Sequence, residues 1–322
     1  MDIPRRALAA LSFTTLAPRA RAQAIIERPA RMLLGSAPGG ATDTTARLLA
    51  AELRPRYAPQ VQVENRPGAS ARLGLEALRG AVADGSVMHF GPLPVLTLFP
   101  HVMARTTRYN PFTDFVPVAT LGLMPFVWVV RAEHPARDLR GFLDGLPGRE
   151  GNFAPNVVGT PQHLMGLSIA ARAGVRLTAI SYRGAVLAHP DLLAGRIDSA
   201  INQLGDVAEH LRAGRMRALA VSTQHRLAWL PQTPTFAESG FPGLPEDEAS
   251  ILLLPAGAPR AMVEALHAAV AEAGRSPALL EGLARLNVTP NILAPDAAAA
   301  RLREESAGFA GLVRQTGFTV EE

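Results

Sequence analysis

The chain of 322 residues contains no cysteine and no lysine, and all 32 of its basic residues are arginine. Without cysteine it can form no disulfide, thiol nucleophile, Cys-ligated zinc site or iron–sulfur cluster. Without lysine it lacks the phosphate-binding residue of a Walker-type loop and the amine that forms a Schiff base with a carbonyl cofactor. The absence of cysteine leaves the compartment open, because a chain of this length can bury a core that needs no disulfide.

Catalytic motifs are also missing. The patterns H-E-x-x-H, G-x-S-x-G and G-x-G-x-x-G do not occur, and the eight histidines are scattered without the spacing of metal ligands. We therefore expect no metal, no cofactor and no catalytic residue. A hydrolase whose triad is assembled from distant residues is the alternative that the sequence leaves open.

The first 24 residues have the three-part pattern of an export signal. Arg5 and Arg6 precede an uncharged, largely apolar run over residues 7–17, and Ala20, Ala22 and Ala24 allow cleavage after Ala22 or Ala24. The alternative is an amphipathic helix of the folded domain. The two arginines leave both the Sec and the twin-arginine routes open. No later segment is long and apolar enough for a membrane helix, so we expect a soluble periplasmic protein.

The formal charge of +4 comes largely from this segment. Without residues 1–24 the chain has 28 arginines and 27 acidic residues, a formal charge of +1. No basic patch is left to indicate nucleic-acid binding.

From residue 25 onward, short apolar runs alternate with helical patterns, which predicts an α/β fold with largely parallel strands. Residues 126–130 and 251–254 are strongly apolar strands, and a self-contained βαβ series lies between them. Within that series the pattern predicts a helix over residues 161–173. Three helical segments follow at 259–273, 277–286 and 295–315 without a sheet of their own. We therefore predict a first domain of residues 25–124 and 251–322 and an inserted second domain of 125–250, with chain crossings near 123–125 and 249–254 as a hinge.

Glycine-containing turns mark several strand-to-helix junctions. Residues 37–43 (APGGATD), 156–163 (NVVGTPQH) and 182–184 (YRG) each join a predicted strand to a helix. Free amides at such helix starts favour anions, although Thr42, Asp43 and Thr160 could equally be ordinary helix caps. Tyr182 and Arg183 could be a pocket wall and a carboxylate partner, or a core aromatic and a solvated cation. Ligands of open α/β sheets bind beyond the carboxyl ends of the strands, so these turns predict an interdomain site for a small anion.

The sequence resembles the tripartite tricarboxylate transporter substrate-binding receptors, the Bug family, from about Arg31 to Gly317. The matching stretches are APGGATDTTARLLA (37–50), VENRPGA (63–69), DFVPVA (114–119), GTPQHL (159–164), YRGA (182–185), LLAGRIDSAI (192–201), RAGRMRALAVST (212–223), LPQTPTFAESGFPGL (230–244) and PAGAPRAMVEAL (255–266). The resemblance implies two α/β domains of the type II periplasmic-binding (Venus flytrap) class, joined by crossing strands. It also implies a small carboxylate ligand, a two-subunit membrane permease as partner and, we expect, a monomeric receptor.

The family's ligand contacts can be transferred by position. The first domain would contribute Ala37, Pro38, Gly39, Gly40, Thr42 and Asp43, with Gly91 and Pro92 from the turn after the strand at 87–90. The second domain would contribute Ala154, Gly159, Thr160, Tyr182, Gly184, Asn202 and Asp206.

Two expected pocket segments depart from the family pattern. Residues 91–94 (GPLP) are more apolar and rigid than the usual polar turn, and residues 152–156 (NFAPN) replace a loop rich in Gly and Ser. An apolar or aromatic monocarboxylate is therefore as compatible with the sequence as a tricarboxylate or an amino acid. Two other roles for the chain are a sensor of the same ligands that acts on a receptor kinase, and an enzyme on this scaffold.

Overall fold

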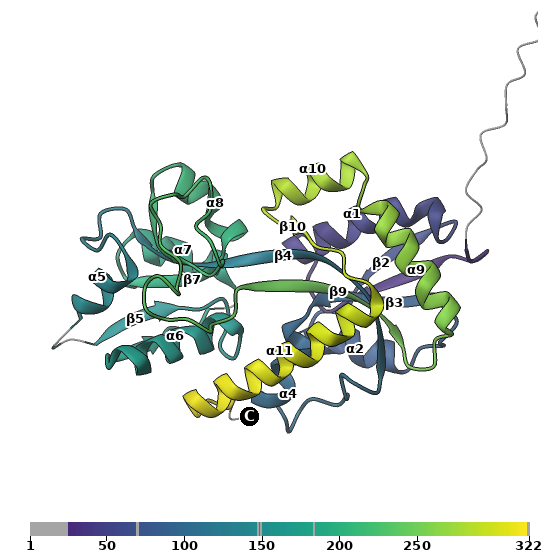
Figure 1. Cartoon of the computed structure of the whole chain (residues 1–322), viewed down its shortest axis with the longest axis horizontal. Helices are drawn as coiled ribbons and strands as arrows, with labels where there is room; N and C mark the ends of the chain where they lie inside the picture. Colours follow the sequence, from purple (N-terminus) through teal and green to yellow (C-terminus); the bar gives the residue numbers. More distant parts are fainter. Residues whose placement is uncertain (1–24, 69–70, 147, 149, 183, 321–322) are drawn as a thin grey trace, which may run out of the picture.

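A computed structural model of the protein describes residues 25–68, 71–146, 148, 150–182 and 184–320. The predicted export signal, residues 1–24, lies outside the described residues. Two α/β domains lie side by side along the long axis of the molecule and are connected by long strands (Figure 1). Among the described residues, no helix combines the length and the apolar character that crossing a membrane requires.

The first domain is built on three parallel strands, each followed by a helix. In chain order its elements are β1 (Ala30–Leu34), α1 (Ala41–Arg56), β2 (Val61–Asn65), α2 (Arg72–Arg79), β3 (Val87–Pro92), α3 (Pro94–Thr97) and α4 (Phe99–Val102). The chain returns later with α9 (Arg260–Ala273), α10 (Pro277–Arg285) and β10 (Thr289–Pro290). Strand order β2-β1-β3 continues through an antiparallel pairing into β9 (Asp247–Pro255).

The second domain repeats the parallel arrangement with strand order β7-β5-β6. Its elements are α5 (Leu139–Asp144), β5 (Gly151–Ala154), α6 (Pro161–Ala173), β6 (Leu177–Ala179), α7 (Ala185–Leu193), β7 (Ser199–Gln203), α8 (Leu204–Arg212) and β8 (Met216–Val221). Helix α6 begins at a proline in the first helical position and ends at Gly174, which has a positive φ of 68°. These local signals explain why its predicted bounds agree with the structure.

Strand β4 (Phe115–Arg131) belongs to both domains. Its first part pairs with β9 and β10, and its last part pairs with β7 and β8. Residues 121–125 of β4 and 247–250 of β9, here called the crossing, pair between the domains through Leu123 with Ala249 and Pro125 with Asp247. The predicted strand at 126–130 is thus only the end of a 17-residue strand.

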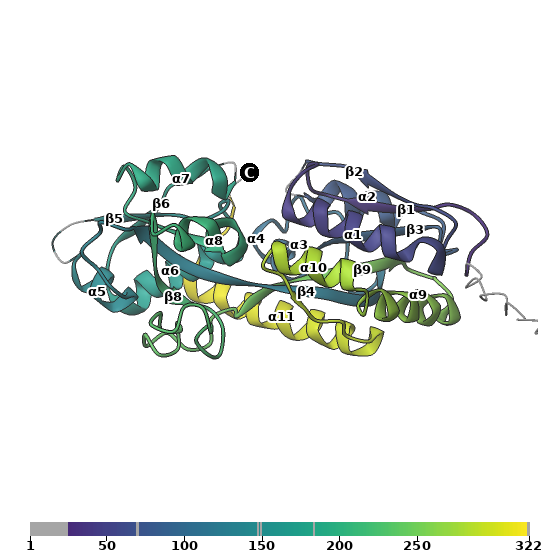
Figure 2. The ribbon, with the colours of Figure 1, turned by 90° about the horizontal axis from the view of Figure 1, so that it is seen from above.

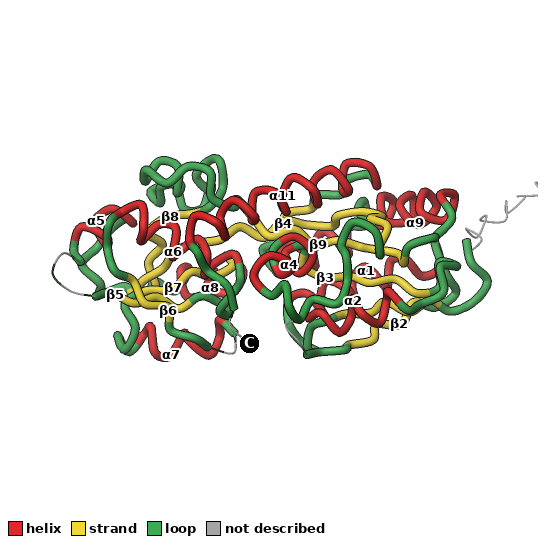
Figure 3. The backbone as a smooth tube through the Cα atoms, turned by 90° about the horizontal axis from the view of Figure 1, so that it is seen from below, coloured by secondary structure: helices red, strands yellow, loops and turns green. Residues whose placement is uncertain are grey.

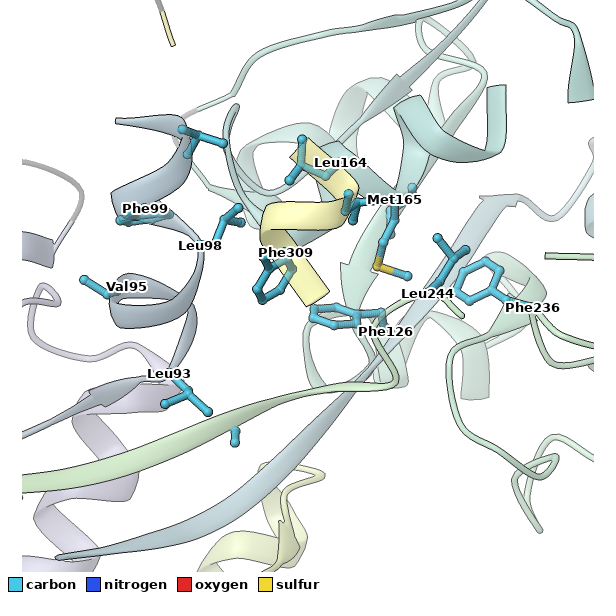
Figure 4. Packing of buried hydrophobic residues seen from close by; sticks show 14 of the residues in the cluster. Leu93, Val95, Leu98, Phe99, Phe126, Leu164, Met165, Phe236, Leu244 and Phe309 are labelled. Atoms are coloured by element: carbon cyan, nitrogen blue, oxygen red, sulfur yellow. The ribbon is translucent and has the colours of Figure 1, made fainter. Parts of the chain in front are cut away.

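Helix α11 (Pro295–Thr316) runs along β4 and spans both domains (Figure 2). It contacts α3 and α4 of the first domain and α6 of the second. Phe309 lies between Leu98 of the first domain and Phe126 and Met165, so one buried cluster continues from domain to domain (Figure 4). Burial of this apolar surface stabilises the fold. It also holds α11 against both domains.

Candidate functional site

The carboxyl ends of the parallel strands in the two domains point toward each other. β3 ends at Pro92, which pairs with Ser250 of the crossing, and β7 ends at Gln203, which pairs with Phe126 at the other end of the crossing. Strands β1 and β2 run parallel to β3, and β5 and β6 run parallel to β7. The predicted junctions of both domains therefore face the region between the domains. Figure 3 shows α4 and α8 on its two sides.

The turn at residues 37–40 is exposed and is held in place by Asp43. The buried Asp43 carboxylate accepts hydrogen bonds from Gly39 N–H (2.9 Å), from Arg47 (2.9 and 3.0 Å) and from Asn65 Nδ2 (2.8 Å). Burial alone would raise the pKa of Asp43, but these hydrogen bonds outweigh it and lower the pKa to about 2. Asp43 is thus ionised and holds the turn in place. Its hydrogen bond with Asn65 was not predicted from the sequence.

The N-cap residue of α1 is a glycine, so no side chain caps the first amides of this helix. Gly40 precedes α1 in an extended conformation and caps it without a side chain, so neither Thr42 nor Asp43 is the cap residue. The first amides of any α-helix lack intrahelical acceptors and carry the positive end of the helix dipole. The open end of α1 can therefore accept an anion in the direction of the second domain.

Gly91 and Pro92 lie within β3 itself, where they pair with Ile251 and Ser250, and the expectation of a turn at these residues is wrong. A Cβ atom on Gly91 would lie 2.7 Å from the buried ring of His89, so a larger residue would have to displace that ring. His89 is fully buried, its ring nitrogens have no hydrogen-bond partner in the protein, and burial lowers its pKa to about 3. His89 is consequently a neutral core residue at neutral pH.

The second-domain junction at 154–160 is formed by the end of β5 and the start of α6. Ala154 is buried, and Gly159 has a φ of 84° that favours glycine. The Gly159 N–H donates to His163 Nδ1 (3.2 Å), and Thr160 Oγ1 donates to the carbonyl of Val157 (2.6 Å). Thr160 is the N-cap residue of α6 by position, but its side chain does not cap the helix.

The third junction places Tyr182 against α7 and leaves its helix start open. Tyr182 OH donates to Asp191 Oδ2 (2.6 Å), and burial, followed by that hydrogen bond, raises the Tyr182 pKa to about 12. Gly184 precedes α7 with a φ of 126°, which again favours glycine. The Tyr182 hydroxyl therefore links this junction to α7 through Asp191. Arg183 lies outside the described residues.

Asn202 and Asp206 follow one another from β7 into the first turn of α8. Asn202 is fully buried, and its side-chain amide lies beside the ring of His189. Burial raises the pKa of Asp206 to about 6, against a smaller opposing effect of a hydrogen bond from Asn156. Asn202 and Asp206 thus place an amide and a carboxyl side chain at this junction.

Two buried acids that local sequence patterns do not reveal, Glu248 and Glu305, lie near each other at the crossing. Glu248 on β9 accepts a hydrogen bond from Gln203 Nε2 (2.6 Å), and Glu305 on α11 accepts one from Thr97 (2.8 Å). Burial raises the pKa of Glu248 to about 8 and that of Glu305 to about 7, and neighbouring negative charges contribute. Glu248 directly precedes the predicted chain crossing at 249–254, and this position was the only sequence feature that could have indicated a buried acid. Its burial depends on residues that are distant in the sequence.

A cavity of about 580 Å³ lies between α11 and the segment 243–247. None of the predicted ligand contacts lines it. Among the described residues, no group of three or more His, Asp or Glu side chains could hold a metal ion. The predicted contacts thus lie at facing junctions of the two domains, and their role in binding stays a prediction.

Comparison with known proteins identifies the family. The family model for the tripartite tricarboxylate transporter family receptor matches residues 45–317. The chain belongs to this family. BugT from Bordetella pertussis is 33% identical over 297 residues, which cover 90% of each chain. The receptor is therefore a solute-binding protein of the Bug type, and receptors of this family are periplasmic and are not enzymes.

Solved structures support the same fold. MatC from Rhodopseudomonas palustris with bound malate is 27% identical, with a TM-score of 0.77 over 89% of this chain and 99% of that one. An R. palustris protein with adipate is also 27% identical, with a TM-score of 0.80 over 91% of this chain and 98% of that one. The two-domain periplasmic-binding fold predicted from the sequence is confirmed.

Proposed function

We propose that this receptor captures a small organic carboxylate between its two domains and delivers it to a two-subunit membrane permease. The observation that carries the proposal is the set of facing junctions: the open start of α1 on one side and Gly159, Gly184, Asn202 and Asp206 on the other. The malate- and adipate-bound relatives support a carboxylate as the ligand class.

Ligand capture requires the domains to approach each other about the crossing. A ligand that binds better to the closed form shifts the equilibrium toward it. The crossing consists of two paired strands, and we propose 25–124 with 251–322 and 125–250 as the domain limits about it. We expect a monomer, because each chain supplies both sides of the site.

A calorimetric and thermal-shift screen of the periplasmic protein with organic acids tests this function. A ligand at about 100 times its dissociation constant should stabilise the protein by about 2.7 kcal/mol. Stabilisation by carboxylates but not by their amides or alcohols is expected. A neutral compound that stabilises the protein when no carboxylate does so would contradict the proposal.

A further inference from the structure

Four exposed hydrophobic side chains lie at strand-to-helix junctions on the carboxyl side of the parallel strands. Of the large hydrophobic residues that are exposed, four lie at these junctions: Leu73 (41% exposed), Val157 (39%), Val186 (70%) and Leu187 (60%). We call these four residues the apolar rim. Scattered single hydrophobic residues are normal on a protein surface, whereas the adjacent Val186 and Leu187 expose apolar surface side by side.

Helix α7 shows that the rim is not needed for the packing of its own domain. Ala188 and Leu192 of α7 are buried in the core of the second domain, one helical turn apart. Val186 and Leu187, in the first turn directly after Gly184, lie outside that buried stripe and are exposed. The amphipathic pattern calls for polar residues at such positions.

The first domain presents a matching residue. Leu73 is the second residue of α2, whose Leu75 and Leu78 are fully buried in the core. Val157 belongs to the loop that leads to Gly159 and Thr160. The rim residues thus lie at the helix starts, or in the loop before one, that belong to the proposed site.

The described arginines at these junctions already form ion pairs or hydrogen bonds within the protein. Among the described residues there, Arg47 pairs with Asp43, Arg66 pairs with Glu64, and Arg72 donates to Thr106. Among the described residues at these junctions, a second carboxylate would find no guanidinium without a partner, and Arg183 lies outside them. Removing that charge from water without a partner is unfavourable.

We propose that the apolar rim contacts a hydrophobic ligand body, so that the receptor prefers an aromatic or medium-chain monocarboxylate over a short di- or tricarboxylate. This inference rests on the proposed function. The carboxylate would lie at the open helix starts and the hydrophobic part would lie against Val186 and Leu187 on one side and Leu73 on the other. Contact with these side chains would remove apolar surface from water on both partners.

Calorimetric titration of the periplasmic protein with benzoate, octanoate, malate and adipate tests the proposal. We expect benzoate or octanoate to bind at least about tenfold more tightly than malate. The double variant Val186→Ser/Leu187→Ser should weaken binding of the preferred acid about tenfold and change malate and adipate by less than about twofold. Val82→Ser is the matched control, because Val82 is 68% exposed in the loop before β3, away from the junctions, and should change nothing.

The possible outcomes separate the two proposals. If malate or adipate binds most tightly, the preference inferred from the rim is wrong while the carboxylate function stands. If the double variant weakens all acids equally, the rim serves contact between the domains and the specificity proposal is overturned. If none of the acids binds and a neutral compound does, the carboxylate function and the inference both fail. Circular dichroism of the variants checks that their fold is retained.

Discussion

The ring of Phe318 stands edge-on to the ring of His163, with 4.4 Å between centroids and an interplanar angle of 87°. Phe318 follows α11, whereas His163 lies in the first turn of α6 in the second domain. Two residues farther on, Val320 N–H donates to the carbonyl of Val102 (2.9 Å) on α4 of the first domain. The segment 318–320 therefore connects the two domains beside the Gly159 junction.

Replacing Phe318 should loosen this connection. Phe318→Ala removes an aromatic pair that contributes about 0.5–1.5 kcal/mol beyond its buried area, so we expect a lower melting temperature and more movement between the domains. Because the chain has no cysteine, two introduced cysteines can carry spin labels, one on each domain, for distance measurements. The distance distribution should broaden in Phe318→Ala and not in Phe112→Ala, where the ring is 50% exposed. An unchanged distribution would show that the segment does not restrain the domains.

His163 should make stability depend on pH. Burial lowers the pKa of His163 to about 4, and its Nδ1 accepts the Gly159 N–H, which a protonated ring cannot do. Between about pH 6.5 and pH 4 the unfolded chain binds the proton and the folded chain does not, so stability is complete above this range and decreases as the pH falls.

We expect His163→Gln to reduce that dependence by on the order of 1–2 kcal/mol between pH 7 and pH 4.5. Urea unfolding of both proteins at several pH values provides the measurement. Parallel curves for the variant and the natural protein would exclude His163 as the group responsible.

Glu248 should act in the opposite direction. Its pKa is raised to about 8 by burial, so the folded chain retains a proton that the unfolded chain has lost above about pH 4.5. Its contribution to stability therefore declines as the pH rises from about 4.5 to 8. Glu248→Gln keeps an oxygen that can accept from Gln203 and carries no charge, so it should raise the melting temperature at pH 8 by at least about 2 °C. A gain of the same size at pH 4.5 would argue against ionisation as the cause.

Gly205 permits a close approach between the domains. A Cβ atom on this residue of α8 would lie 2.7 Å from the carbonyl oxygen of Leu286 in the first domain. We expect Gly205→Ala to destabilise the protein by about 1–3 kcal/mol, because neither backbone can move aside alone. Gly308→Ala is the control in chemical unfolding: no atom lies within 4 Å of its Cβ position, and the change should be neutral or stabilising by up to about 1 kcal/mol.

Gly40 tests the first-domain side of the proposed ligand site. Its backbone is extended, and the nearest atom to an added Cβ, the carbonyl oxygen of Ala37, is 4.0 Å away, so Gly40→Val should leave the fold intact. The larger side chain would cover the open start of α1 and weaken carboxylate binding by about 10- to 100-fold, the effect of losing a hydrogen bond to a charged group. Calorimetry with the acid that binds most tightly is the measurement, and unchanged affinity would remove this turn from the site.

Local sequence patterns were sufficient for the α/β class and for the bounds of α6 to the residue. These features depend on apolar periodicity and on Pro and Gly at helix ends, which act within a few residues. Tertiary structure decided what distant residues do together. It placed Gly91 and Pro92 inside β3, because β9 supplies their pairing partners, and it extended β4 through both domains. It also made Asp43 an anchor through Asn65, buried Glu248 against Gln203, and brought Phe318 onto His163. Burial and hydrogen bonds between residues far apart in the chain cause each of these, and no local pattern encodes them.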